Sequence, residues 1–374
     1  MLGGIAVFIA LVLFIVAHEA GHYFAAKATG MKVTEFFLGF GPRIWSFKRG
    51  ETEYGIKPIP FGAYVKVVGM SSLEEVDPED EGRTYREKPF WAKSLVVLSG
   101  VAANFLIGYF IFFGISLAEG QPVLEDGEPV PSTSIAAVVP ETADGEPTSA
   151  VEIGLEPGDT IVSIDGTRTP DWESLVEALG ESAGEEITVG VVRDGEELSL
   201  SGRLGVRVVD GEERGFLGVS PRVLTEPIGV GEAVVTAGEQ VVNGVAFTFE
   251  SFARLLTFDT LGQIFSGISG GEIDDEVRPV SLVGVVQIGA QANEFGVTNV
   301  LFILAIINII LGTLNVVPLF PLDGGHFAVA VYEKLTGKTA DIRKLIPVAV
   351  VVIAFISIFG LAAIVLDIVQ PIDL

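Results

Sequence analysis

Four stretches of this 374-residue chain are apolar over a length that suits a membrane-crossing helix: roughly residues 2–25, 93–118, 297–322 and 345–370. A helix needs about 20 residues to cross the hydrocarbon core of a bilayer, and in lipid its backbone polar groups must be bonded internally. The first stretch has no basic region before it and does not resemble a cleaved signal peptide, so we interpret it as a retained span. The sequence therefore predicts a polytopic α-helical membrane protein with four transmembrane helices.

The charges between the apolar stretches predict how the chain is oriented. Residues 26–93 contain eleven Lys/Arg and ten Asp/Glu, and the loop 333–344 carries four more Lys/Arg. Residues 119–296 contain eight Arg, no Lys and thirty-three Asp/Glu. Basic loops favour the cytoplasmic side, so we expect residues 119–296 outside a cell-membrane protein that crosses several times. The acidic region reflects either salt adaptation or an exported acidic domain, and it argues against a nucleic-acid partner.

The first apolar stretch contains two of the chain's three histidines, in the sequence His18-Glu19-Ala20-Gly21-His22. Residues i and i+4 share one face of a helix, so both imidazoles can bind one Zn²⁺ ion. Glu19 lies beside them, where its carboxylate could act as general base for a water molecule on that ion. The chain has no cysteine, so any transition metal must be held by His, Asp or Glu. Ionisable groups are costly in a membrane span, which favours a functional site.

A third metal ligand would have to come from elsewhere, and the end of the third apolar stretch offers Asp323. Residues 315–326 are interrupted by Pro and Gly, and interrupted backbone near membrane depth is typical of a site. His18 lies about 25 Å along the first helix at 1.5 Å per residue, and Asp323 lies at the far end of a span that runs the same way. Both should therefore reach the same depth, toward the cytoplasmic side. His326 could be a further ligand or lie near the site without binding metal.

Residues 33–68 predict β-hairpins rather than a soluble loop. Residues 36–41 and 59–65 are apolar, punctuated by glycine and partly alternating. Non-helical backbone is tolerated at membrane depth only where it lines a cavity enclosed by protein. We therefore expect membrane-associated β-hairpins beside the first span, within a first transmembrane half that covers residues 1–118.

The region 119–225 predicts one extracytoplasmic α+β domain. Its pattern suits a turn and a strand at 153–166, a helix at 171–180 with Asp171 as N-cap, and strands at 186–193 and 196–201 joined by Asp194-Gly195. This pattern resembles a bacterial PDZ domain inserted between the second and third spans. Its candidate peptide-binding loop, which could equally be an ordinary turn, contains Gly154, Leu155, Gly158 and Asp159.

Residues 228–268 have apolar residues at helical spacing, for example Val234, Val241 and Val245, and predict one or two amphipathic helices. These helices could lie on the outer membrane surface or pack against the PDZ-like domain. We assign residues 226–296 to this extracytoplasmic amphipathic or linker region and residues 297–374 to the second transmembrane half.

Three separated motifs, in this order along the chain, resemble the site-2 protease family of intramembrane zinc metalloproteases. They are the HExxH motif at 18–22, Gly100-x-x-x-Asn104 in the second span, and the sequence that starts at Asn315 and contains Leu-Asp-Gly at 322–324. The single PDZ-like domain between spans two and three resembles the bacterial branch of that family. The resemblance covers nearly the whole chain.

The resemblance implies a metal site and a base. His18, His22 and Asp323 would bind one Zn²⁺ ion per chain, and Glu19 would be the catalytic residue that deprotonates water. The enzyme would then be a zinc metalloendopeptidase that hydrolyses a peptide bond within or beside a transmembrane helix.

The resemblance also implies how a substrate is held. Asn104 and Asn315 would hold the substrate backbone or polarise its carbonyl, which is effective in a dry site. The strand that contains Phe61, Gly62 and Ala63 would pair with an unwound substrate by strand addition.

The implied substrates are single-span membrane proteins that reach the enzyme within membrane lipid. They would be anti-sigma factors already trimmed outside by an upstream site-1-type protease, or remnant signal peptides. The PDZ domain would restrict access to such trimmed chains.

Two other classes of function are less compatible with the sequence. A zinc transporter would need ionisable residues along several spans, whereas the second and fourth have almost none apart from Asp367. A membrane-anchored PDZ adaptor would not need Glu19. Peptide-bond hydrolysis is therefore the favoured function.

Overall fold

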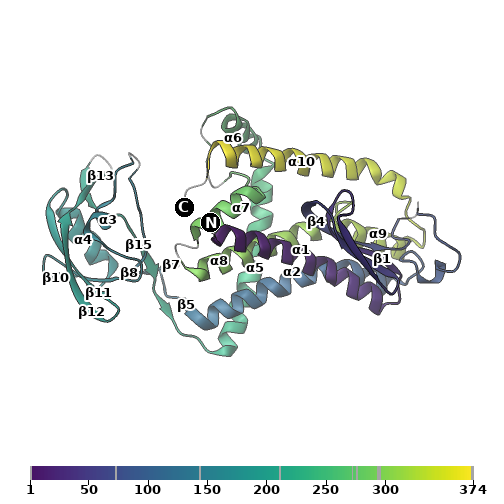
Figure 1. Ribbon diagram of the computed structural model, residues 1–374, viewed down its shortest axis with the longest axis horizontal. Coiled ribbons are helices and arrows are strands. Elements are labelled where there is room, and N and C mark those ends of the chain that lie inside the picture. Colours follow the sequence, from purple (N-terminus) through teal and green to yellow (C-terminus); the bar gives the residue numbers. More distant parts are fainter. Residues whose placement is uncertain are drawn as a thin grey trace. The chain divides into compact units, whose positions relative to one another are not determined.

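The computed structural model describes residues 2–71, 74–142, 145–209, 212–271, 273–274, 277–292 and 296–371. The chain divides into two compact units, one made of Met1–Ile115 with Val234–Leu374 and the other of Ser116–Ala233 (Figure 1). The first unit holds the long apolar helices, and the second is built mainly of strands.

Four long helices confirm the four predicted spans. They are α1 (Leu2–Ala28), α2 (Phe90–Glu119), α8 (Val297–Val316) and α10 (Ile346–Val369). Each is long and apolar enough to cross a membrane. Their side chains are apolar all round, as expected for helices that face lipid on one side and other helices on the other.

The third predicted span, 297–322, is wrong at its C-terminal end. The helix α8 ends at Val316, and residues 317–322 are not helical. Pro318 and Pro321 lack the backbone N–H that a helix needs, and each disfavours helical backbone in the residue before it. A new helix, α9 (Asp323–Thr336), begins directly after this break. Asp323 therefore lies in the first turn of a separate helix. Short 3₁₀ turns occur at Glu81–Arg83 and Ile342–Lys344.

Residues 33–67 fold into one four-stranded sheet beside α1. Its strands are β1 (Val33–Phe40), β2 (Trp45–Arg49), β3 (Thr52–Ile56) and β4 (Ile59–Val67), in the order β2-β3-β1-β4. The strand β1 pairs parallel with β3 and antiparallel with β4, where Phe36 lies opposite Val65 and Leu38 opposite Ala63. The strand β4 therefore forms one edge of the sheet, and it also contacts α1.

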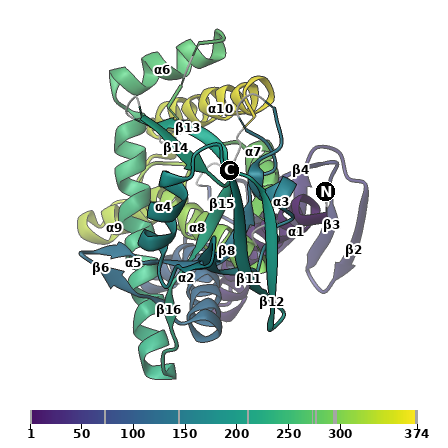
Figure 2. The same cartoon turned by 90° about the vertical axis from the view of Figure 1, so that its left-hand side faces the viewer.

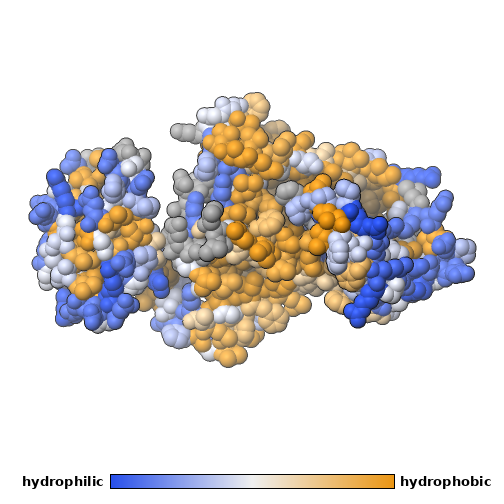
Figure 3. Space-filling model, viewed as in Figure 1, coloured by the Kyte–Doolittle hydropathy of each residue, from blue (hydrophilic) through white to orange (hydrophobic). Residues whose placement is uncertain are grey.

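The surface of the first unit separates apolar from polar side chains. Apolar side chains cover the region of the long helices, and hydrophilic side chains gather at the end near β1 (Figure 3). Large exposed apolar residues are frequent on α10, for example Val351, Ile358 and Leu361. An exposed apolar surface of this extent is suited to contact with lipid tails.

Three further helices lie between the second unit and α8 in the chain. They are α5 (Val230–Leu255), α6 (Phe258–Ile268) and α7 (Leu282–Ala292). The first two confirm the helices predicted over 228–268, whereas α7 was not predicted. Both views show α5 running across α2 rather than along it (Figures 1 and 2). Ala237 of α5 packs on Phe112 of α2 and Ile309 of α8, so the helix rests on the membrane helices.

A buried ion pair ties α10 to α7. The Asp367 carboxylate accepts from the Arg278 guanidinium at 3.2 Å and from the backbone N–H groups of Ser281 and Gly284 at 2.8 and 3.1 Å. These two N–H groups lie at the N-terminus of α7, where backbone donors have no partner inside their own helix. Asp367 thus caps α7 from a different helix, which gives this isolated charge in the fourth span a structural role.

The second unit is an α+β domain around one main sheet. The main sheet has the order β12-β11-β9-β8-β15 and contains β8 (Pro131–Val138), β9 (Thr160–Ile164), β11 (Glu186–Arg193), β12 (Glu196–Arg203) and β15 (Val219–Val223), with β10 (Thr167–Arg168) paired to β9. Its helices are α3 (Ser149–Ile153) and α4 (Trp172–Glu181). Shorter paired strands are β5 (Gln121–Pro122), β6 (Leu124–Glu125), β7 (Glu128–Pro129), β13 (Gly205–Val209), β14 (Glu212–Phe216) and β16 (Thr225–Glu226).

Local signals in the second unit are confirmed. Asp171 caps α4, and its carboxylate accepts from the Ser174 backbone N–H at 2.8 Å. The turn between β11 and β12 is Asp194-Gly195, and both residues have positive φ, as a two-residue hairpin turn requires. Alternate residues of β11 are buried in the core with Leu175 of α4, which accounts for the period-two pattern of the sequence.

The Arg278–Asp367 pair yields a prediction about stability. Asp367→Leu should leave a buried guanidinium without its carboxylate and α7 without its cap, which costs roughly 3–5 kcal/mol when one partner of a buried pair is removed. Thermal unfolding in detergent measures this loss. Arg278→Leu in the same chain should restore part of it. Glu250→Gln, which breaks the exposed pair with Arg254, is the control and should change stability by about 0.5 kcal/mol or less. A loss for Asp367→Leu no larger than the control would contradict this assignment.

Candidate metal and catalytic site

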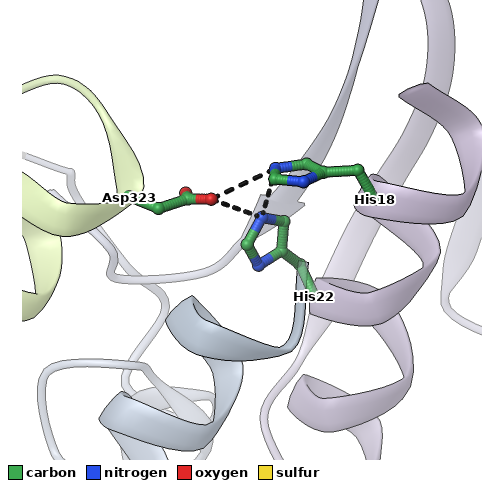
Figure 4. Close-up of side chains that lie close together, drawn as sticks. All are labelled: His18, His22 and Asp323. Atoms are coloured by element: carbon green, nitrogen blue, oxygen red, sulfur yellow. Dashed lines mark hydrogen bonds and ion pairs between the residues drawn. The ribbon is translucent and has the colours of Figure 1, made fainter. Parts of the chain in front are cut away.

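Three side chains from two helices converge on one point. His18 and His22 lie one turn apart on α1, and Asp323 is the first residue of α9. Asp323 Oδ2 lies 3.1 Å from His18 Nε2 and 3.3 Å from His22 Nε2, and the two Nε2 atoms are 3.2 Å apart (Figure 4). Ligands held at about 2.0–2.1 Å by a tetrahedral ion lie about 3.3 Å from one another. The three donors thus have the mutual spacing of three corners of a tetrahedral metal site.

A hydrogen bond sets the protonation of His22. Its Nδ1 lies 2.7 Å from the backbone carbonyl oxygen of Val96 in α2. A carbonyl can only accept, so Nδ1 carries the hydrogen, and in a neutral imidazole Nε2 then has a free lone pair. Metal-ligating histidines are usually oriented by such a bond from the other ring nitrogen. His22 is therefore held with its lone pair toward His18 and Asp323.

Two glycines allow α1 and α2 to approach closely at the site. A Cβ on Gly21 would lie 2.4 Å from the Ser99 carbonyl oxygen, and a Cβ on Gly100 would lie 2.4 Å from His22 Nε2 and 3.0 Å from His18 Cε1. The two contacts of 2.4 Å are shorter than a Cβ atom tolerates. The HExxH glycine and the first residue of the Gly-x-x-x-Asn motif therefore meet, and Gly100 provides the space in which the two imidazoles sit.

The charge on Asp323 suits a cation site. Its carboxylate lies at the point on which both imidazoles converge. The N-terminus of α9 also favours a negative charge at its first residue. The site thus combines two imidazole nitrogens with one carboxylate oxygen. Among the described residues, these three are the group that could hold a metal ion.

Most of the predicted site residues line one cavity of about 310 Å³. Its walls include His18, Glu19, Gly62, Ala63, Asn104, Asn315 and Asp323, together with Ile15, Leu311, Pro321 and Leu322. The backbone of Phe61 lies in β4 beside this cavity, and its side chain falls outside the described residues. The cavity therefore brings together parts of the chain from residue 15 to residue 323.

The two predicted asparagines differ in their bonding. The amide of Asn315 donates to the Leu311 carbonyl oxygen one turn earlier at 3.1 Å. Asn104 is 2 % exposed, and its side-chain oxygen has no hydrogen-bond partner among the residues described. The backbone carbonyl oxygen of Asn104 accepts from the side-chain amide of Asn308 on α8 at 2.9 Å. Neither the role of Asn308 nor the packing contact of Gly21 is predicted by a motif in the sequence.

His326 lies apart from the three converging donors. Its ring contacts Phe320 at a centroid distance of 4.8 Å. It also lines a second cavity of about 390 Å³ with Tyr85, Lys93 and Glu333. Burial lowers the pKa of His326, so its imidazole is neutral near pH 7. The three converging donors are His18, His22 and Asp323, and His326 is not among them.

The candidate peptide-binding loop of the second unit is bonded internally. Gly154 ends α3 with a positive φ, and its carbonyl oxygen accepts from Arg193 at 2.8 Å. The same guanidinium donates to both carboxylate oxygens of the buried Asp159 at 2.7 and 2.8 Å. Burial would raise the pKa of Asp159, but Arg193 outweighs it and lowers that pKa. Leu155 belongs to the domain core, and Gly158 has a positive φ. Peptide binding here stays a prediction.

Comparison with known proteins links the whole chain to one group of enzymes. The model of "Peptidase family M50" matches residues 6–359. The zinc metalloprotease Rip1 of Mycolicibacterium smegmatis is 32% identical over 411 residues, which cover 99% of this chain and 98% of the relative. Rip1 of Mycobacterium tuberculosis is 31% identical over 99% of this chain and 98% of its own. The zinc metalloprotease RasP of Shouchella clausii is 26% identical over 92% of each.

The contact of Gly100 with both imidazoles yields a prediction about metal binding. Gly100→Ala should displace His22 and His18 and weaken Zn²⁺ binding by roughly 10- to 100-fold, as changes that disturb ligand orientation do. Competition with a chelating dye and the zinc content of purified protein measure this. Gly114→Ala is the matched control, because Gly114 lies on the same helix with nothing within 4 Å of its Cβ position. Equal zinc affinity in both variants would rule out the proposed contact.

Proposed function

Because the chain belongs to peptidase family M50, the site-2 protease family, we propose that it is an intramembrane zinc metalloendopeptidase that cleaves transmembrane segments of single-span membrane proteins. One observation carries the proposal. Two imidazole nitrogens and one carboxylate oxygen lie 3.1–3.3 Å from one another, beside a cavity that also contains Glu19. The helices that supply the imidazoles and the cavity wall are those long and apolar enough to cross a membrane.

The donor set fits Zn²⁺. Nitrogen and oxygen donors from two histidines and one acid are a usual set for catalytic zinc, and three protein ligands leave one tetrahedral position open. The relatives named above are zinc metalloproteases. When bound, Zn²⁺ supplies Lewis acidity and lowers the pKa of water, so that water can act as a nucleophile toward a carbonyl at neutral pH. One ion per chain would be held by His18, His22 and Asp323.

The other residues of the cavity have separate proposed roles in the reaction. Glu19 accepts the proton of the attacking water and delivers it to the leaving amide nitrogen. Asn104 has a buried amide next to this position, and its N–H groups can donate to the carbonyl oxygen as negative charge develops there. Asn315 lines the same cavity and would hold the substrate backbone. Leu311 and Leu322 keep the cavity partly apolar, which strengthens these interactions by excluding water.

The edge strand β4 is the proposed binding place for the substrate chain. Its residues Gly62 and Ala63 line the same cavity as Glu19. An edge strand presents backbone N–H and C=O groups to which an extended peptide can add. A transmembrane helix has its backbone groups bonded internally, so it must unwind locally before it can pair with β4 in this way.

The orientation of the chain follows from its charges. We place the acidic region 119–296 outside the cell membrane and the metal site toward the cytoplasm, because basic residues concentrate in 26–93 and 333–344. Residues 119–225 would then be an extracytoplasmic PDZ domain. It would admit substrates already trimmed by a site-1-type protease, such as anti-sigma factors, or remnant signal peptides. Membrane lipid surrounds enzyme and substrate.

Rival functions lack support of this kind. A transporter needs ionisable groups along its path, but Asp367 of the fourth span is bonded to Arg278 and to the N-terminus of α7. An adaptor would have no use for Glu19 beside a metal site.

The role of Glu19 can be separated from metal binding. Glu19→Gln should keep its zinc and lose peptide hydrolysis by roughly 10²- to 10⁴-fold, because the amide cannot accept the proton of water. Cleavage of a labelled single-span peptide in detergent micelles measures activity, and the zinc content is determined on the same sample. His22→Ala is the control that should lose both zinc and activity. A Glu19→Gln enzyme that binds zinc and cleaves at the rate of the original chain would disprove the mechanism.

Metal removal provides an independent test. Treatment with a strong zinc chelator should abolish cleavage of the same peptide, and added Zn²⁺ should restore it. Mg²⁺ or Ca²⁺ should not, because both ions prefer oxygen donors at six or more positions. Cleavage that persists in protein shown to be free of zinc would reject the metallopeptidase assignment.

A further inference from the structure

A buried amide joins α8 to α2 beside the catalytic cavity. Asn308 is fully buried in the third span, and its Nδ2 donates to the Asn104 carbonyl oxygen at 2.9 Å. The donor and acceptor residues are separated by 204 positions in the chain. Polar side chains in a membrane span are costly, so this one needs an explanation that apolar packing cannot supply.

The packing around this hydrogen bond is unusually close. A Cβ on Gly108 of α2 would lie 2.5 Å from the Ile309 side chain, so α8 contacts the backbone of α2 there. A Cβ on Gly312 would lie 3.2 Å from the Cβ of Asn104. On both sides of the bond, a side chain of one helix therefore packs directly on a glycine of the other, Ile309 on Gly108 and Asn104 on Gly312. This packing restricts movement of Asn104.

The same segment of α2 also contacts the metal ligands. Gly100 lies one turn before Asn104 on the same face, and the position that a Cβ on Gly100 would occupy lies against the rings of His22 and His18. Val96, one turn earlier again, accepts the hydrogen bond of His22. A shift of α2 by one residue relative to α8 would move it about 1.5 Å along the axis and rotate its side chains away from the cavity.

We propose that Asn308 is a positioning residue. It fixes the axial position of α2 relative to α8, so that the Asn104 side chain faces the reacting carbonyl. This inference rests on the proposed peptidase function and on the role of Asn104 in it. A polar residue that only joined two helices could bond anywhere along the span. This one bonds the backbone of Asn104, which lines the catalytic cavity and whose side-chain oxygen has no hydrogen-bond partner among the described residues.

The test compares Asn308→Leu, which keeps the size but removes the donor, with Thr313→Val. Thr313 is equally buried on the same helix, but its hydroxyl donates within α8, to Ile309. Turnover of a labelled single-span peptide in micelles is measured with zinc content and thermal stability. Asn308→Leu should lower kcat by roughly 10- to 100-fold while KM stays within about twofold, because geometry and not binding is disturbed. Zinc content and unfolding temperature should match those of Thr313→Val.

A double-mutant cycle decides between positioning and plain stabilisation. If Asn308 acts through Asn104, Asn308→Leu should cause no further loss of kcat in an Asn104→Ala chain. Asn308→Gln, which keeps a donor, should recover part of the activity. The inference would be overturned if the two substitutions lowered kcat independently, so that their losses multiplied in the double variant. A loss of zinc or an unchanged kcat in Asn308→Leu would also overturn it. Full activity of Asn104→Ala would instead refute the role proposed for Asn104, so the two failures are distinguishable.

Discussion

The close contact between α1 and α2 is the constraint on which the site depends. Gly21 and Gly100 bring the two backbones together, and the imidazoles of His18 and His22 occupy the space that a side chain on Gly100 would fill. The carbonyl of Val96 then fixes the ring of His22. Since α2 also carries Asn104, one helix orients an imidazole of the candidate metal site and forms part of the cavity wall. The site is thus an outcome of helix packing in which small residues allow hydrogen bonds and ligands to approach.

Sequence reasoning reaches the features that are local along the chain. The four spans follow from length and hydropathy, the HExxH face from helical spacing, and the cap at Asp171 from residue type. Contacts between segments that are distant along the chain cannot be predicted in this way. Nothing in the spacing of α8 reveals that Asn308 meets the backbone of Asn104, although a lone Asn two turns before Asn315 is a signal that could have been followed. The end of α8 was misjudged because hydropathy continues through residues whose prolines end the helix.

A charge inside a span need not be part of a reaction. Asp367 is fully buried, and its partners are Arg278 and the first N–H groups of α7. It serves a buried helix end, where backbone donors require an acceptor. Arg193 serves the second unit in a comparable way, by holding Asp159 and the carbonyl of Gly154. For Asp367 the buried backbone donors of α7 explain the ionised side chain, and for Arg193 the buried carboxylate of Asp159 does.

The position of Asp323 has a consequence for biosynthesis. The two histidines leave the ribosome with the first span, whereas the carboxylate that completes the donor set stands at residue 323 of 374. A partly synthesised chain therefore carries Glu19 and two of the three converging donors without the third. The candidate metal site is complete only after residue 323 has been made and α9 has reached α1. A membrane-embedded protease built in this order lacks its full donor set during most of its own synthesis.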